Sequence, residues 1–307
     1  MRSSAHLWRV GVALAIASAA LTACSDDDSG SEDATASTST TATTAAPATS
    51  TTRAAAERST IVGLEGVLGY WLDGRWVQAQ TGQPVPITPG DGFTLVRLAG
   101  DPSSATVRGI KEENEYCRNT LVTFDPPFPD PSGGDDLMPI GVTDVDDPQV
   151  RPVEVLDPGA EAYRSAASDV LAGLGIDDPD PTVVQVVRAD LADDGTDEVL
   201  VVAERLDDTR AVFGQPGDYS VLFLRQVVDG EVRTTVLEQF YKDPAKEAQE
   251  PSPYIVMSRV SAVADLNGDG VMEVVVQERY YEGSATVVRA LDADGSLDEV
   301  IAAGCGI

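Results

Sequence analysis

Short runs of apolar and β-branched residues, separated by Gly, Asp and Pro, recur from residue 61 to the end of the chain. In "GYWLDGRWVQA" (69–79), Asp73-Gly74 stands between two apolar-aromatic arms, which is the strongest short-range pattern for a β-hairpin. A two-residue turn sets Trp71 opposite Trp76 on one face of the two strands. Such a pair is more typical of a core than of a platform for a ligand. The pattern predicts a mainly β fold.

One stretch has a helical period instead, "DPGAEAYRSAASDVLAGLG" (157–175). Its apolar residues fall near one stripe, namely Tyr163, Ala167, Val170, Leu171 and Leu174. The end signals are Asp157 as the N-cap, Pro158 in the first helical position, and Gly173 or Gly175 as the terminator. We therefore predict one helix near 158–173, packed on a sheet.

The second half of the chain contains an internal repeat. The segment "RADLADDGTDEVLVV" (188–202) aligns with "VADLNGDGVMEVVV" (263–276) at an offset of 265 − 190 = 75 residues. A strand-like run precedes each segment, and another strand and a hairpin pattern follow it. Each copy is thus predicted as strand, loop, strand, strand, turn, strand. Repetition of such a unit is typical of blade-like sheets stacked side by side, so we predict antiparallel blades in a partial propeller or a sandwich.

The loop of the second copy has the spacing of a metal site. Oxygen ligands stand at positions 1, 3, 5 and 9 of nine residues, namely Asp265, Asn267, Asp269 and Glu273, with the carbonyl of Val271 at position 7. Oxygen ligands alone, three of them anionic, favour Ca²⁺ over transition metals. An EF-hand would need a carboxylate at position 12 and flanking helices, whereas Val276 stands there and the flanks are strands.

The loop of the first copy keeps most of these ligands. Asp190, Asp194 and Glu198 recur and Thr196 takes position 7, but Ala192 replaces the ligand at position 3. We expect a weaker site here, with water or Asp193 in the missing place.

The alternative for both loops is an Asx-type turn, in which carboxylates accept backbone N–H groups. Such a turn explains Asp265 and Asp269 but leaves Glu273 without a role. A third similar stretch, "DADGSLDE" (292–299), has Ala290 in place of the first ligand, so we predict only a turn there.

From Asp265 to Glu273 the pattern resembles the calcium loops of FG-GAP and VCBS-type repeats, the β-propeller blades of integrin-like proteins. The resemblance covers only about residues 180–303, and two units do not close a propeller, which takes at least about four blades. It implies a structural Ca²⁺ at 265–273 and a possible second one at 190–198.

The N-terminus has the features of an export signal. Arg2 and Arg9 accompany the uncharged run "VGVALAIASAAL" (10–21), which is shorter than the roughly 20 residues that span a bilayer. The following "LTAC" (21–24) resembles the lipobox of bacterial lipoproteins. By that resemblance Cys24 becomes the lipid-bearing first residue, which anchors the protein on the extracytoplasmic face of the cell membrane. The alternative is an ordinary secretory signal.

These observations divide the chain into four parts. Residues 1–23 are the predicted signal peptide, and 24–60 are a Ser/Thr/Ala-rich tether with too few large apolar side chains to fold. An N-terminal β region follows at 61–150. The helix and the two repeats occupy 151–307.

Charge and residue usage exclude several function classes. Without the two arginines of the signal, 19 basic residues face 51 acidic ones, a net charge of 19 − 51 = −32. This charge repels nucleic acids and anionic lipid headgroups, so we predict membrane attachment through the lipid on Cys24 and no nucleic-acid partner. The only histidine, His6, lies in the signal, which excludes histidine-dependent triads and imidazole metal sites from the mature chain. The remaining cysteines, Cys117 and Cys305, are predicted to form a disulfide in an oxidising compartment.

The sequence thus favours a non-enzymatic envelope module: a lipid-anchored, calcium-stabilised β domain that binds an unknown protein or glycan ligand or has a structural role. One alternative is a glycoside hydrolase that uses two carboxylates, for which we would expect a cleft with such a pair near Trp71 and Trp76. Another is an accessory or sensing subunit of an envelope complex.

Overall fold

The computed structural model describes residues 57–80, 82–112, 119–128, 137–177, 179–206, 213–243 and 254–306. The chain forms two units, Met1–Pro47 and Ala48–Ile307, and every described residue belongs to the second. The predicted signal peptide, Cys24 and most of the predicted tether lie outside the described residues.

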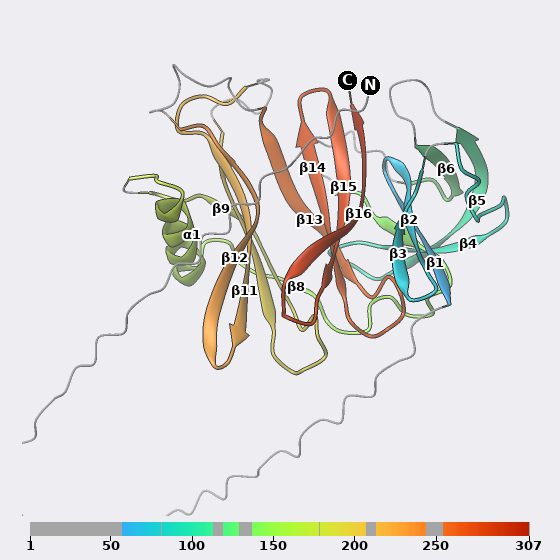
Figure 1. Ribbon diagram of the computed structural model, residues 1–307, viewed down its shortest axis with the longest axis horizontal. Coiled ribbons are helices and arrows are strands. Elements are labelled where there is room, and N and C mark those ends of the chain that lie inside the picture. Colours follow the sequence, from blue (N-terminus) through green and yellow to red (C-terminus); the bar gives the residue numbers. More distant parts are fainter. Residues whose placement is uncertain are drawn as a thin grey trace, which may run out of the picture. The chain divides into compact units, whose positions relative to one another are not determined.

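Three antiparallel sheets make up the second unit (Figure 1). The seven-stranded sheet has the order β3-β2-β1-β7-β4-β5-β6, with β1 (Arg58–Gly63), β2 (Gly66–Leu72), β3 (Arg75–Gln78), β4 (Gly92–Val96), β5 (Ser103–Glu112), β6 (Thr120–Asp125) and β7 (Ile140–Val142). The five-stranded sheet has the order β12-β11-β10-β9-β8, with β8 (Glu154–Val155), β9 (Val183–Ala189), β10 (Glu198–Arg205), β11 (Tyr219–Val228) and β12 (Glu231–Tyr241). The four-stranded sheet contains β13 (Val256–Ala264), β14 (Glu273–Tyr280), β15 (Gly283–Leu291) and β16 (Leu297–Gly306) in sequence order. The predicted mainly β fold with antiparallel, blade-like sheets is confirmed.

The two repeat copies correspond to two sequential meanders. Strands β9 to β12 form the first and β13 to β16 the second, and each strand pairs with the next one along the chain. The loops 190–198 and 265–273 each join the first strand of a copy to the second. Strand β8 is an addition to the first meander, which makes that sheet five-stranded.

The predicted hairpin of β2 and β3 is present. Trp71 and Trp76 are paired across the strands, with ring centroids 5.1 Å apart and ring planes inclined by 66°. Asp73 and Gly74 have φ values of 51° and 77°, which is the left-handed conformation that a two-residue turn between twisted strands requires. Both indoles are half-buried rather than fully in the core.

The predicted helix forms, but it begins later than expected. Helix α1 spans Glu161–Gly173, and its N-cap, Ala160, makes no side-chain capping bond. Asp157 is not the cap because its Oδ1 accepts the N–H of Gly159 at 2.9 Å, forming a turn that precedes the helix. At the other end Gly175 adopts a φ of 87°, and the N–H groups of residues 175 and 176 close the last turn.

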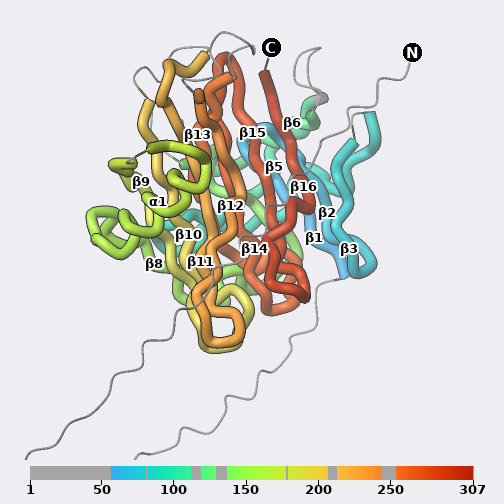
Figure 2. Tube along the Cα trace, turned by 60° about the vertical axis from the view of Figure 1, so that its left-hand side comes forward, coloured from blue at the N-terminus to red at the C-terminus, as the bar shows by residue number. Residues whose placement is uncertain are grey.

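Helix α1 packs on the five-stranded sheet, as predicted (Figure 2). Ala167 and Leu171 are fully buried in a cluster with residues of β9, β10 and β11. Among the described residues, no helix has the length and apolar character needed to cross a membrane.

The folded part starts earlier than the predicted tether boundary at residue 60. Strand β1 begins at Arg58, and Ser59 and Thr60 are buried. The Ser59 hydroxyl donates to the carbonyl of Leu266 at 2.7 Å, and the N–H of Thr60 donates to the hydroxyl of Thr143 at 3.0 Å. Hydrogen bonds rather than apolar area hold this segment, so its composition gave no sign of burial.

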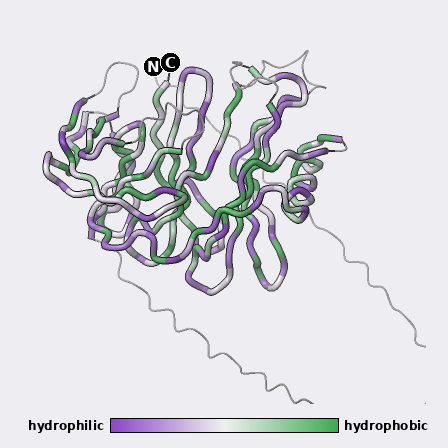
Figure 3. The backbone as a smooth tube through the Cα atoms, turned by 180° about the vertical axis from the view of Figure 1, so that it is seen from behind, coloured by the Kyte–Doolittle hydropathy of each residue, from purple (hydrophilic) through white to green (hydrophobic). Residues whose placement is uncertain are grey.

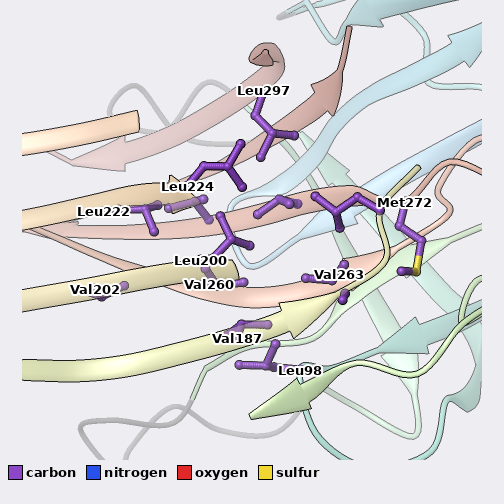
Figure 4. Packing of buried hydrophobic residues seen from close by; sticks show 14 of the residues in the cluster. Leu98, Val187, Leu200, Val202, Leu222, Leu224, Val260, Val263, Met272 and Leu297 are labelled. Carbon is purple, nitrogen blue, oxygen red and sulfur yellow. The ribbon is translucent and has the colours of Figure 1, made fainter. Parts of the chain in front are cut away.

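The four-stranded sheet contributes to two core clusters, one on each face. Alternate residues such as Val260, Val274 and Val276 pack with the five-stranded sheet, as Figure 4 shows for part of this cluster. Ala262 and Val275 belong to the other cluster, with residues of the seven-stranded sheet. Accordingly, the hydrophobic positions follow the strands and the connecting loops are more hydrophilic (Figure 3).

Two buried glutamines join the sheets through paired bonds to a backbone residue. Gln185 of β9 donates to the carbonyl of Val260 and accepts its N–H, both at 2.9 Å, which links the five-stranded sheet to β13. Gln277 of β14 likewise donates to the carbonyl of Met138 at 2.9 Å and accepts its N–H at 3.1 Å. Each side-chain amide therefore makes the pair of hydrogen bonds that a backbone residue makes in a β-sheet, and so connects separate parts of the fold.

We predict that Gln277→Leu lowers the free energy of unfolding by about 2 to 4 kcal/mol, because it leaves two buried backbone groups of Met138 without partners at nearly constant volume. Urea denaturation of the folded domain measures this loss. Gln239→Leu, at an exposed position of β12, is the control and should stay within about 0.5 kcal/mol of the wild type. Equal losses in the two variants would contradict the role assigned to Gln277.

Candidate functional site

The loop 265–273 lies inside the protein, although its sequence is polar. Asp265, Asn267 and Glu273 are only 0%, 2% and 1% exposed. The reason is its position: it joins β13 to β14, the strands of the sheet that contributes to both core clusters. Every buried polar atom of the loop must therefore find a partner within the protein or in a bound ligand, whereas Asp269, Gly270 and Val271 are partly exposed.

The Asp265 carboxylate organises the loop. It accepts three backbone N–H groups, from Gly268 at 2.5 Å, Asp269 at 3.1 Å and Gly270 at 2.9 Å. Gly268 and Gly270 have φ values of 77° and 93°, so the chain bends in the left-handed region at both positions. The turn wraps around one carboxylate.

The other predicted ligands bond within the same loop. Asn267 accepts the N–H of Asp269 at 2.9 Å and donates to its Oδ2 at 3.0 Å, while Asp269 Oδ1 accepts the N–H of Val271 at 2.8 Å. Glu273 Oε2 accepts the N–H of Leu266 at 2.7 Å. The expectation that a turn without metal leaves Glu273 without a role is therefore wrong, because this carboxylate closes the loop onto its second residue.

The loop 190–198 reproduces this arrangement. Four hydrogen bonds recur at the same offset of 75: Asp194 N–H to Asp190 Oδ1 at 3.1 Å, Gly195 N–H to Asp190 Oδ2 at 3.0 Å, Thr196 N–H to Asp194 Oδ1 at 2.7 Å and Leu191 N–H to Glu198 Oε2 at 2.9 Å. Asp193 and Gly195, with φ values of 59° and 81°, take the places of the two glycines. Ala192 lacks the amide of Asn267, and Asp194 is exposed.

The two loops are in contact with each other. The N–H of Met272 in the second loop donates to the carbonyl of Leu191 in the first at 2.9 Å. Arg151 covers the first loop, since its guanidinium donates to the carbonyls of Asp190 at 2.6 Å and Leu191 at 3.0 Å. It also lies 3.6 Å from the Asp193 carboxylate.

Burial and mutual repulsion raise the pKa of the closing glutamates. For Glu273 the main cause is desolvation; the N–H of Leu266 opposes it, and the carboxylates of Asp269 and Asp265 reinforce it, so that the pKa lies well above the usual value. The pKa of Glu198 is raised for the same reasons, with Asp194 and Asp190 as the neighbours. The hydrogen bonds thus satisfy the geometry of these carboxylates, while burial and the neighbouring carboxylates disfavour their charged form.

The oxygen-bearing residues of the loops suit a hard cation by their chemistry, but their arrangement suits one only in part. The loop brings together Asp265, Asn267, Asp269 and Glu273, whose oxygens retain lone pairs beyond those that accept N–H groups. Within the described part of the chain, no three acidic, histidine or cysteine side chains are disposed to hold a metal ion. For Val271 and Thr196 the described bonds involve the N–H group, not the carbonyl predicted as a ligand.

A cavity of about 360 Å³ adjoins the second loop. Trp71 and Trp76 of the hairpin line it together with Asn267, Asp269 and Glu273 of the loop. Two further carboxylates, Asp292 and Asp298, come from the turn and strand that follow β15. The sequence interpretation missed these two as site residues because it treated 292–299 only as a turn, although their acidic clustering near the repeat was visible.

That turn itself forms as predicted. The N–H of Asp292 donates to the carbonyl of Ser296 at 2.8 Å, and the N–H of Gly295 donates to the carbonyl of Asp292 at 2.9 Å.

The C-terminal cysteine is oxidised. Cys305 is disulfide-bonded. Cys117 lies outside the described residues, so the predicted pair stays a prediction. Residues near the two cysteines in the sequence lie close together in space: the side chain of Asn119 donates to the carbonyl of Gly304 at 3.1 Å.

Comparisons with models of protein families, with curated proteins and with solved structures yielded no match to this chain.

A separate group of charges lies on the four-stranded sheet and its neighbour. Burial, followed by the nearby Glu238 carboxylate, raises the pKa of Glu278 to about 7; Arg289 opposes this shift and Glu299 adds to it. Arg289 forms its ion pair with Glu238 rather than with Glu278. Glu278 is thus an acid that the fold holds in a partly protonated state near neutral pH.

The raised pKa of Glu278 predicts a pH-dependent difference between the wild type and Glu278→Gln. Because the folded pKa exceeds the unfolded one, the contribution of Glu278 is favourable below about pH 4.5 and is lost as the pH rises through about 7. With allowance for solvent screening, we expect the variant to melt about 2 to 8 °C higher at pH 8, and to show little difference at pH 5. Thermal melts across this range test it, with Glu231→Gln, at an exposed position of β12, as the control. A difference independent of pH would contradict the prediction.

Proposed function

We propose that the protein is a lipoprotein of the cell envelope, held on the extracytoplasmic face of the cell membrane by a lipid on Cys24. Its folded β domain acts as a non-enzymatic binding or structural module, stabilised by calcium. The observation that carries the proposal is the repeated acidic loop, in which the same carboxylate bonds occur in both copies and burial together with neighbouring carboxylates raises the pKa of the closing glutamate.

Calcium would be held by the second loop through Asp265, Asn267, Asp269 and Glu273. The ion would supply positive charge where three carboxylates share a buried loop, and so would offset their repulsion and desolvation. The first loop, with Asp190, Asp194 and Glu198, has one ligand fewer and is more exposed, so we propose weaker binding there. The role that we propose for the metal in both loops is stabilisation of a turn whose backbone N–H groups the carboxylates accept.

Mass action sets the size of this effect. With about 1 mM calcium outside the cell and a dissociation constant of about 0.1 mM, one site adds RT ln 11, or about 1.4 kcal/mol, to the free energy of unfolding. This corresponds to a rise in melting temperature of about 3 to 6 °C for a domain of this size.

We predict that calcium raises the melting temperature of the wild type by this amount, and raises that of Asp269→Ala much less. A calcium titration followed by thermal melts in a chelator-treated buffer measures it. Asp294→Ala is the matched control, because Asp294-Gly295 repeats the Asp-Gly step of the loop in the turn that lacks the first ligand. Identical calcium responses of the wild type and Asp269→Ala would remove the metal from the proposal and leave a turn closed by hydrogen bonds.

The anchor is tested separately from the domain. We predict that the wild-type protein sediments with membranes and that Cys24→Ala appears in the soluble or secreted fraction, because the mature chain, with its net charge of −32, has little affinity for anionic lipids. Cell fractionation followed by immunoblotting measures the distribution. A membrane-bound variant that is released only by detergent would contradict lipid anchoring through Cys24.

A carboxylate-dependent glycoside hydrolase is the second candidate. The observation in its favour is the cavity, which places carboxylates beside Trp71 and Trp76, together with the raised pKa that Glu273 shares with the proton donors of such enzymes. Hydrolysis of cell-wall or soluble glycans by the wild type, abolished in Glu273→Gln and retained in Glu299→Gln, would favour this enzyme over the binding module.

A further inference from the structure

The cavity beside the second loop is built by two sheets. The hairpin of β2 and β3 approaches β16 closely: at Gly69 a Cβ atom would lie 2.5 Å from the carbonyl of Val77 and 2.8 Å from Ile301. The N–H of Ala302 also donates to Gln78 at 2.9 Å. The tryptophan pair is therefore held in a defined position over the edge of the four-stranded sheet, and the cavity that it lines with the second loop is part of the folded structure.

The walls of this cavity carry an excess of negative charge. Four carboxylates line it, namely Asp269, Glu273, Asp292 and Asp298, and the described residues that line it include no lysine, arginine or histidine. Carboxylates that share a partly desolvated space repel one another, and a positively charged occupant relieves this repulsion more than a neutral one.

The aromatic walls select the kind of cation. Trp71 and Trp76 present two ring systems inclined by 66° with centroids 5.1 Å apart. The face of an indole attracts a cation through its quadrupole more strongly than any other side-chain ring, and aromatic walls are the usual recognition element for alkylated ammonium groups. A hydrated metal ion gains little from such walls, whereas an organic cation gains both burial and charge compensation.

We infer that this cavity binds an organic cation, with an alkylammonium head group that has the tryptophan pair on one side and the carboxylates on the other. The inference rests on the proposed function in that it gives the binding module a class of ligand. It does not require calcium, since Trp71, Trp76, Asp292 and Asp298 all lie outside the metal loop. A volume of about 360 Å³ accommodates a head group with a short chain.

The chain provides its own reporter for this site. It contains three tryptophans, Trp8, Trp71 and Trp76, and Trp8 lies in the predicted signal peptide. In the mature protein, intrinsic tryptophan fluorescence therefore comes only from the two indoles that line the cavity. A change in this fluorescence on titration reports occupation of the site directly.

The test compares choline with its uncharged isostere, 3,3-dimethyl-1-butanol, in a fluorescence titration of the mature protein. We expect a saturable change with choline and an apparent affinity at least about tenfold lower for the isostere. Binding of choline should weaken severalfold between about 20 and 200 mM NaCl, since the attraction is electrostatic. Equal responses to choline and the isostere, or a response to N-acetylglucosamine but not to choline, would overturn the inference in favour of an apolar or a saccharide site.

Two neighbouring substitutions locate the site. Asp298 and Glu299 are adjacent, exposed residues of β16, and only Asp298 lines the cavity. Asp298→Asn and Glu299→Gln remove the same charge, so they affect the long-range field alike. We expect Asp298→Asn to weaken choline binding about five- to tenfold and Glu299→Gln less than about twofold. Equal effects would show that the cation responds to the net charge of the protein and not to this cavity.

Titrations in chelator and in calcium separate the two proposals. Choline binding in chelator, in a protein whose melting temperature does not respond to calcium, would support the cation site and remove the metal. Calcium stabilisation without any choline response would support the metal site and overturn the organic-cation site. If both ligands bind, calcium should lower the apparent affinity for choline severalfold, because the loop carboxylates Asp269 and Glu273 face both.

Discussion

Burial of the four-stranded sheet on both faces is the constraint on which the rest of the structure depends. Val274 and Val276 pack toward one neighbouring sheet, and Val275 packs toward the other. The connection between β13 and β14 starts and finishes inside the protein, since Asp265 and Glu273 are buried at its two ends. The polar loop 265–273 must therefore satisfy its backbone groups itself, and carboxylates that accept N–H groups accomplish this.

That solution has an electrostatic consequence. Asp265 accepts three N–H groups and Glu273 accepts one, so the directional requirements of the loop are met. Burial nevertheless raises the pKa of Glu273, and the carboxylates of Asp269 and Asp265 add to this shift although the N–H of Leu266 opposes it. The same residues thus account for a stable turn and are those through which we propose that a cation binds.

The parts of the fold that the sequence predicted are those set by local pattern. The pairing of Trp71 with Trp76 follows from the two-residue turn between them, and the two meanders follow from the repeat. The start of α1 was misplaced because the turn at Asp157 competes with capping, and both use the same side-chain oxygen. The bonds of Gln277 to Met138 and the approach of the hairpin to β16 depend on contacts across more than 130 residues, which no local pattern encodes.

The two loops show that the repeat determines the turn but not the surroundings of the turn. Both have the same four carboxylate bonds, so their common sequence fixes a common turn. Their surroundings differ. The first loop is covered by Arg151, whose guanidinium lies against two of its carbonyls and near Asp193, so the protein supplies a cation of its own there. The second loop instead adjoins a cavity with two indoles and two further carboxylates. Because the turn is common to both copies, any difference in ligand binding between them must come from Ala192 in place of Asn267 and from the different surroundings of the two loops.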